Sequence, residues 1–472
     1  MPVREKLKLM VRILGVLLIC CLSSKAQSLF QNTYGTLNAE ERAFDMVVLD
    51  DHSIITFGDR YETSTFNRTG YLLKVDEDGN EQWNRELSSN EELYGTSICQ
   101  LPNGNVLLAG YDYDVPNLQF GLMVAVYNES NGLPVYQKTH ELSLNANAKG
   151  VVPMSDNGAI VLCAVEDVID SNSMLVRVNS SGDTVWTKLI DLYSDDEYPE
   201  SIVTVSDGVV ISGTAGSPSD IFVAKFDLSG NLQWEKRHQT SENDLNGGLS
   251  VIPSGGFLLT GTSTDNTTGA YKMVGLKLDA SGNEVWKNCY NLDHNKFDLG
   301  YGVDAMPDGG AIFIGSGYKA DTSNFRDLML VRTDASGIVI WTKFYGNVLA
   351  ETGYTVIADG NRIVGSGKGD VNDSEDVLIL TTDFDGNTTV GIEENSNEKS
   401  LLVYPNPFTN QLNISPPPQT TKPQPFKVID LSGRTIDTGV LQSNTTLDLK
   451  SLPSGTYFLS VSNMTTVVIV KI

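Results

Sequence analysis

The chain has 472 residues, of which 40% are hydrophobic and 19% are charged, the proportions of a globular protein with more than one domain. Its 33 basic and 59 acidic residues give a formal net charge of -26 at pH 7. Such an excess of acid repels phosphate backbones and anionic lipid, so nucleic acid is not expected as a partner. The charge is interpreted as a solvated surface that keeps an exported protein soluble, with a set of calcium sites as the alternative.

The first 26 residues have the pattern of a secretory signal peptide. Basic residues precede an apolar run from Ile13 to Leu22, and the small residues Ser24 and Ala26 occupy the two positions that a signal peptidase recognises before its cleavage site. We predict cleavage between Ala26 and Gln27. The apolar run is shorter than the roughly 20 residues that cross a bilayer, and no later run is long enough, so no transmembrane segment is predicted.

One β-hairpin pattern recurs along the body of the chain, most clearly from Ile221 to Trp234. Apolar residues lead into a type I turn that Asp227 opens and Gly230 closes with a positive φ. The turn glycines of the seven copies are Gly79, Gly132, Gly182, Gly230, Gly282, Gly337 and Gly386. Four residues later six copies have an aromatic residue, namely Trp83, Tyr136, Trp186, Trp234, Trp286 and Trp341, and the seventh has Val390. We expect these aromatic side chains to fill the space between stacked sheets.

A second hairpin alternates with the first, for example at Met306 to Gly310 followed by the apolar run Ala311 to Gly315. Two hairpins in each period of about 50 residues give four antiparallel strands, the blade of a β-propeller. We therefore predict an all-β fold, with a seven-bladed propeller over residues 27–392. The preferred closure places the first hairpin, Phe44 to Gly58, in one blade with the last, Val377 to Val390. Pairing in simple chain order fits the sequence as well.

The residues also resemble a known repeat. The run Asp220 to Gly230, followed by Gly256 to Thr262, is similar to the bacterial β-propeller repeat described as SBBP-like. The similarity covers roughly Phe44 to Val390. It implies the propeller fold and an exported setting, and it carries no catalytic residues to this chain.

A different segment begins after the repeat. Residues 393–400 are predicted to be an exposed linker, and residues 401–472 contain short alternating strands that predict a small Ig-like β-sandwich. This tail resembles the type A C-terminal sorting domain of the type IX secretion system of Bacteroidetes-type bacteria. The matching residues include Tyr404, Pro405, Asn406, Pro407, Phe408, Gly433, Gly455, Tyr457 and Lys471. The resemblance implies the secretion translocon and its sorting peptidase as partners. It also implies a location outside the cell or on its outer surface, after passage through the periplasm.

Chemically active motifs are few. The four histidines have no metal-ligand spacing, and the runs Asp76 to Asn80 and Asp383 to Asn387 lack the bidentate glutamate of a calcium loop. We predict no catalytic residue, cofactor or metal ligand. The candidates for calcium or ligand contact are the acidic segments Tyr111 to Asp114 and Asp191 to Glu197. The body cysteines, Cys99, Cys163 and Cys289, are expected to be buried thiols.

Two functions fit these observations. The first is a noncatalytic surface propeller whose loops bind a glycan or a protein, because scaffolds of this kind use loops for recognition. The second is an enzyme with its site in the central funnel. That enzyme is a polysaccharide lyase, a carboxylate-dependent glycosidase or a quinoprotein-like dehydrogenase.

Overall fold

The chain divides into two compact units, residues 1–390 and 391–472. The computed structural model describes residues 28–36, 38–88, 92–114, 119–142, 144–166, 171–193, 195–238, 243–264, 269–290, 297–319, 325–346, 349–371, 374–388, 402–415, 424–430, 434–441, 445–461 and 467–472. Within these ranges no helix is long and apolar enough to cross a membrane. The predicted linker and cleavage site lie outside the described residues.

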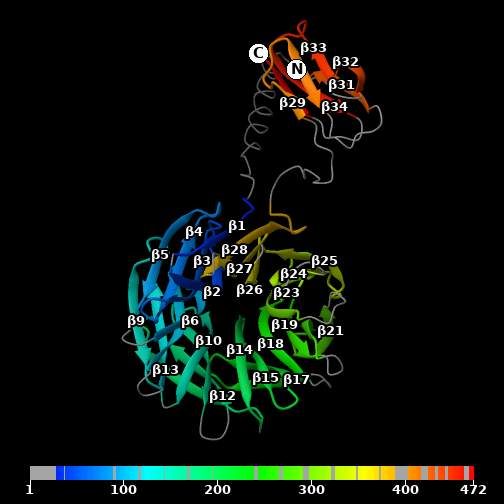
Figure 1. Cartoon of the computed structure of the whole chain (residues 1–472). Coiled ribbons are helices and arrows are strands. Elements are labelled where there is room, and N and C mark those ends of the chain that lie inside the picture. Colours follow the sequence, from blue (N-terminus) through cyan, green and yellow to red (C-terminus); the bar gives the residue numbers. More distant parts are fainter. Residues whose placement is uncertain are drawn as a thin grey trace, which may run out of the picture. The chain divides into compact units, whose positions relative to one another are not determined.

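The first unit consists of seven four-stranded antiparallel sheets arranged around a central axis (Figure 1). In blades 1 to 6 the strands follow one another in chain order from the axis outward. Blade 1 contains β2 (Ala39–Val48), β3 (Ile54–Glu62), β4 (Asn67–Val75) and β5 (Glu81–Leu87), and blade 2 contains β6 (Glu92–Gln100), β7 (Val106–Asp114), β8 (Gln119–Tyr127) and β9 (Pro134–His140). Blade 3 contains β10 (Asn145–Pro153), β11 (Ala159–Glu166), β12 (Ser171–Val178) and β13 (Thr184–Ile190), and blade 4 contains β14 (Glu197–Val205), β15 (Gly208–Ala215), β16 (Asp220–Asp227) and β17 (Leu232–His238). Blade 5 contains β18 (Asn243–Val251), β19 (Phe257–Thr264), β20 (Tyr271–Leu278) and β21 (Glu284–Tyr290), and blade 6 contains β22 (Leu299–Ala305), β23 (Ala311–Gly317), β24 (Asp327–Thr333) and β25 (Val339–Tyr345).

Blade 7 joins the two ends of the propeller. It contains β26 (Glu351–Asp359), β27 (Arg362–Val371) and β28 (Ser374–Asp383), and its outermost strand is β1 (Gln31–Tyr34) from the start of the chain. The preferred closure was therefore wrong, because the first hairpin belongs to blade 1 and pairing follows chain order. A single N-terminal strand covers the edge of β28. This strand is too short to show the alternation by which complete hairpins are recognised.

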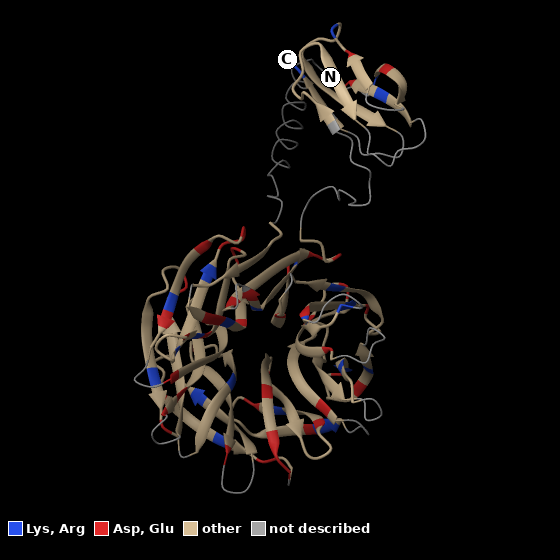
Figure 2. Cartoon of the chain, viewed as in Figure 1, with Lys and Arg blue, Asp and Glu red and all other residues tan. Residues whose placement is uncertain are grey.

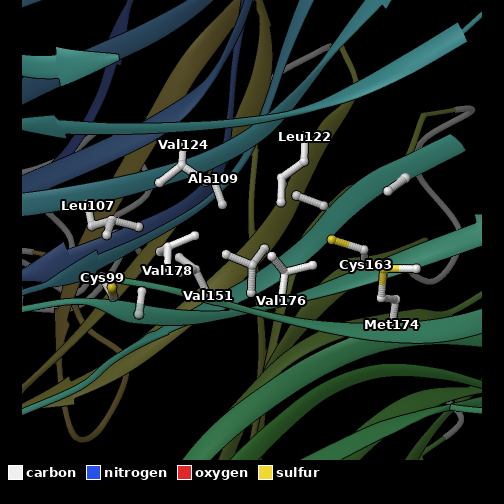
Figure 3. Packing of buried hydrophobic residues seen from close by; sticks show 14 of the residues in the cluster. Cys99, Leu107, Ala109, Leu122, Val124, Val151, Cys163, Met174, Val176 and Val178 are labelled. Atoms are coloured by element: carbon white, nitrogen blue, oxygen red, sulfur yellow. The ribbon is translucent and has the colours of Figure 1, made fainter. Parts of the chain in front are cut away.

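The apolar core is divided into layers between neighbouring blades. Figure 3 shows the layer between blades 2 and 3, where Leu122 and Val124 of β8 face Val151 and Val176 of blade 3. Equivalent clusters lie between the other neighbours, and the one between blades 7 and 1 closes the ring. Each blade therefore buries both faces only when its two neighbours are present.

Two of the three body cysteines lie in the same layer. Cys99 and Cys163 are buried, and burial raises the pKa of both thiols. The expectation that Cys289 is buried was wrong, since this residue is exposed. It lies on β21, an outermost strand whose residues include several that face solvent. A residue-type pattern does not distinguish outer strands from inner ones.

The repeated aromatic residues lie on the outermost strands and contact the next blade at its turn glycine. A Cβ atom added at Gly282 would lie 2.7 Å from the Trp234 ring, so only glycine lets the ring rest on the turn. The seventh contact is made by Phe30, which stands just before β1 and covers Gly79. Tyr34 of β1 donates a hydrogen bond to the carbonyl of Gly79 at 2.6 Å. The N-terminal segment thus supplies the aromatic contact that the sequence pattern lacked.

The second unit has two antiparallel sheets. One contains β29 (Leu402–Tyr404), β30 (Gln411–Ser415) and β33 (Thr445–Asp448), and the other runs in the order β32 (Thr435–Leu441), β31 (Gln424–Asp430), β34 (Gly455–Val461) and β35 (Val467–Lys471). Phe408, Leu412, Val428 and Leu459 belong to one buried cluster that both sheets share. This small β-region agrees with the predicted sandwich.

Candidate functional site

The innermost strand of every blade contains a β-bulge near its middle. The pairing register between the first and second strands shifts at this point in all seven blades. The residues released from pairing are Phe44, Thr96, Lys149, Glu200, Gly247 with Gly248, Tyr301 and Tyr354. A bulge re-aims the side chain that it releases, and all of these residues line one central cavity of about 450 Å³. We call this cavity the channel.

One side of the channel is aromatic. Phe44 of blade 1, Tyr354 of blade 7 and Tyr301 of blade 6 form a continuous arc, with ring centroids 5.3 Å and 5.4 Å apart along it. The guanidinium of Arg42 lies over the Phe44 ring, 5.6 Å from its centroid, in a cation–π contact. The arc contributes three aromatic rings, two of them phenols, to the channel lining.

The opposite side of the channel carries charge. Lys149 of blade 3 and Glu200 of blade 4 form an ion pair, with 3.5 Å between Nζ and Oε1. The side chain of Glu200 is 37% exposed, and the channel walls cover the rest of it. Burial therefore raises the pKa of Glu200, and the ammonium of Lys149 opposes the shift. The pair provides hydrogen-bond donors and acceptors facing the aromatic arc.

Blade 5 contributes no bulge side chain to the channel wall because its bulge consists of Gly247 and Gly248. A Cβ atom at Gly247 would lie 2.6 Å from the carbonyl oxygen of Gly300, so the neighbouring strand comes close here. Asn246 beside them donates from Nδ2 to Oγ of Ser212 at 3.0 Å. Its buried Oδ1 has no hydrogen-bond partner among the described residues.

Asp45 also lines the channel, but its carboxylate is engaged. Oδ2 accepts hydrogen bonds from Oγ of Ser97 at 2.7 Å and from the backbone N–H of Ile98 at 3.0 Å. Burial raises the pKa of Asp45, and these hydrogen bonds oppose the shift. Asp45 therefore ties blade 1 to blade 2. No group of three or more metal-ligating side chains occurs in the part of the chain that the structure describes.

The blade aromatics and the described residues of the two acidic segments are not among the residues that line the channel. The blade aromatics Trp83, Tyr136, Trp186, Trp234, Trp286 and Trp341 stand on the outermost strands, where they join neighbouring blades. Tyr111 to Asp114 belongs to strand β7 and not to a loop, and Glu197 accepts hydrogen bonds from the backbone of Leu192 and Tyr193. Asp383 accepts from the backbone of Asp385 and Asn387 within its turn, as turn chemistry predicted. Ala26, Gln27 and Gly433 lie outside the described residues.

In the second unit the two ends of the tail motif meet. Oδ1 of Asn406 accepts a hydrogen bond from the backbone of Val470 at 2.8 Å, and the buried Phe408 bonds to Val470 and Ile472 through its backbone. Lys471 lies 5.8 Å from the centroid of the Phe408 ring and pairs with Gly455. The first residues of the motif thus hold the last strand in place.

The remaining motif residues differ in exposure. Tyr404, Pro405 and Pro407 are exposed, whereas Tyr457 is buried and donates from its hydroxyl to the carbonyl of Pro453 at 2.8 Å. A tyrosine that bonds to the backbone a few residues upstream stabilises a corner of a β-sandwich.

The channel residues were not found from the sequence. The repeat was recognised by what its copies share, and the bulge position shares no residue type. An alignment of the seven copies on their turns would have shown one position of each first strand that varies freely between aromatic, charged and glycine residues.

Comparison with protein families shows that residues 402–472 match the secretion system C-terminal sorting domain. The tail is therefore a type IX sorting domain, which directs secretion to the cell surface or the extracellular space. A comparison with curated protein sequences finds no match.

Among solved structures, the chain is similar to an α-L-arabinanase of Penicillium chrysogenum, with 10% identity over 75% of this chain and 98% of that one and a TM-score of 0.45. It is also similar to the polysaccharide lyase Uly1, with 10% identity over 77% and 93% of the chains and a TM-score of 0.47. An ulvan lyase of family PL25 gives 10% identity over 75% and 98% and a TM-score of 0.48. These similarities concern the propeller fold alone.

Proposed function

We propose that this secreted propeller is a noncatalytic binding protein that holds a neutral glycan in its channel. The observation that carries the proposal is the ring of bulge residues, in which the aromatic arc of Phe44, Tyr354 and Tyr301 faces the ion pair of Lys149 and Glu200. The apolar face of a sugar ring packs on aromatic π-faces, and its hydroxyls need donors and acceptors. A site with both on opposite walls fits a sugar.

The volume of the channel and the net charge of the chain limit the classes of ligand that the channel can hold. The channel volume of about 450 Å³ lies in the range of roughly 300–1,000 Å³ that small-molecule sites occupy. Figure 2 shows acidic residues spread around the ring with basic residues among them, and the net charge of -26 repels polyanions. A neutral glycan meets no such repulsion.

Catalysis is the second candidate, and Glu200 favours it. A carboxyl with a raised pKa in a recess suits a proton donor for cleavage of a polysaccharide. A glycosidase, however, works with a pair of carboxyl groups. Among the described residues that line the channel the acids are Asp45 and Glu200, and Asp45 is held by Ser97 and Ile98. Binding without turnover therefore has the better support.

The test is isothermal calorimetry of residues 27–472 against a panel of neutral oligosaccharides, with a parallel assay for products. Tyr354→Ala should weaken binding at least tenfold, and Tyr354→Phe, which keeps the ring, should stay close to the wild type. Saturable binding without product supports the proposal. Product formation that Glu200→Gln abolishes would establish the enzyme instead.

The finer steps of export belong to the same proposal. We infer that the leader is removed after Ala26, that residues 393–400 link an SBBP-like propeller to the tail, and that a sorting peptidase removes the tail. Deletion of residues 401–472 should leave the protein in the periplasm. Unchanged delivery to the surface would contradict this route, and N-terminal sequencing that starts elsewhere than Gln27 would contradict the cleavage site.

A further inference from the structure

A second, smaller cavity opens beside the channel at blade 3. Its volume is about 110 Å³, enough to hold several water molecules. Its walls include Phe120 of blade 2, Asn145, Asn147 and Lys149 of β10, and Tyr198 of blade 4. We call it the side pocket. Lys149 lines both cavities, so the two are neighbours that share this side chain.

The strand register shows that the side pocket continues the channel wall. Asn147 stands two residues before Lys149 on β10, and Tyr198 stands two residues before Glu200 on β14. Lys149 and Glu200 are the bulge residues of these strands, and Asn147, Lys149 and Tyr198 line the side pocket together. Asn147 and Tyr198 therefore form the next layer of the wall beyond the ion pair.

The side pocket has aromatic walls. Phe120 stacks on Tyr113, with 4.9 Å between ring centroids, and makes a T-shaped contact with Tyr111, with 5.5 Å between centroids. Its backbone N–H donates to Oδ1 of Asn145 at 3.3 Å. Tyr198 belongs to the blade on the other side of blade 3 and is 48% exposed, an unusual exposure for an aromatic residue on an innermost strand.

One residue that lines the pocket, Asn147, carries a polar atom without a partner in the described part of the chain. Oδ1 of Asn147 is buried and has no hydrogen-bond partner among the described residues. A buried acceptor of this kind lowers the stability of the protein unless a ligand or a water molecule donates to it. The residues that line the pocket thus include the aromatic Phe120 and Tyr198, the amide of Asn147, and the charged Lys149 and Glu166.

We propose that the side pocket is a second sugar subsite of the same site, so that the propeller binds a linear neutral oligosaccharide that runs from the channel past Lys149 to Tyr198. This inference rests on the proposed function. A disaccharide occupies the channel alone, and a longer chain reaches the side pocket and gains contacts with Phe120, Asn147 and Tyr198.

The experiment is calorimetry of residues 27–472 with cellohexaose, xylohexaose and laminarihexaose and with the corresponding disaccharides. The hexasaccharide that binds should do so at least tenfold more tightly than its disaccharide. Tyr198→Ala and Asn147→Ala should remove most of this difference and leave disaccharide affinity unchanged. Tyr198→Phe is the matched control, since it keeps the ring and should keep the difference. Thermal unfolding verifies that each variant is folded.

The outcomes separate the two proposals. If the hexasaccharide binds no more tightly than the disaccharide, or if Tyr198→Ala weakens both equally, the second subsite is refuted while binding in the channel stands. If Tyr354→Ala changes neither affinity, or if the wild type binds none of the sugars, glycan binding in the channel is refuted and the subsite with it.

Discussion

The contacts made by the outermost strands of the propeller repeat from blade to blade, whereas the residues around its axis differ between blades. Around the outside, seven aromatic residues rest on seven turn glycines in nearly the same way, from Phe30 on Gly79 to Trp341 on Gly386. Around the channel, the seven bulge positions carry residues as different as Phe44, Lys149 and Gly247. Both sets occupy one position per blade. The comparison teaches that the contact repeated between every pair of neighbouring blades determines the repeated residues, and that the bulge position, which takes no part in that repeated contact, is available for recognition.

The largest effect is expected from removal of β1. Without residues 28–35, strand β28 loses its outer partner and Gly79 loses the Phe30 ring, so blade 7 has an uncovered edge where the two ends of the propeller meet. We expect this deletion to abolish a single cooperative thermal transition, measured by circular dichroism. A transition within a few degrees of the wild type would show that the propeller is stable without β1 and without the contact between Phe30 and Gly79.

The turn glycines offer a matched pair of variants. Gly282 and Gly104 both have a positive φ, 78° and 88°, but a Cβ atom would meet Trp234 at Gly282 and nothing within 4 Å at Gly104. Gly104→Ala should cost about 1 kcal/mol through backbone strain, and Gly282→Ala about 2–4 kcal/mol because the ring must also move. Urea denaturation measures both values. Equal losses would mean that the aromatic contact adds nothing to stability.

At the axis we expect a substitution to change ligand binding and to leave the fold intact. Because the pKa of Glu200 is raised, its carboxylate gains a proton at a higher pH than an ordinary glutamate does. Glu200→Gln, which resembles the protonated form, should weaken glycan binding several-fold at pH 8 and match the wild type at low pH. Its unfolding free energy should change by less than about 1 kcal/mol. The same loss of affinity at every pH would contradict a role for the ionised carboxylate.

A pH effect on stability is expected at the seam between blades 7 and 1. Burial, and to a smaller extent the charge of Glu41, raises the pKa of Asp376 from 3.8 to about 6. Between these values the folded state binds more protons than the unfolded state, so stability falls as pH rises through this window. Asp376→Asn should therefore stabilise the protein at pH 7, by no more than about 1 kcal/mol for this partly exposed group. The gain should vanish near pH 3, and an equal gain at both pH values would contradict the shift.

The smallest effect concerns the cysteines. In residues 27–472, a thiol reagent should modify about one cysteine in the native state, because Cys289 is exposed whereas Cys99 and Cys163 are buried with raised pKa values. Cys289→Ser should remove the reaction and leave stability unchanged. Rapid modification of that variant would show that a layer between blades opens in the native state.

The sequence by itself determined the repeat, its seven copies and the identity of the tail, because turns and alternating strands depend on residues close together in the chain. Asp227 and Gly230 form their turn with local hydrogen bonds, so the pattern can be recognised in the sequence wherever it recurs. Only the tertiary structure decided how the ring closes and what lies on its axis. Phe30 meets Gly79, and Lys149 meets Glu200, through contacts between separate strands. No local rule encodes such contacts, since they depend on which strand edges and bulges the completed circle brings together.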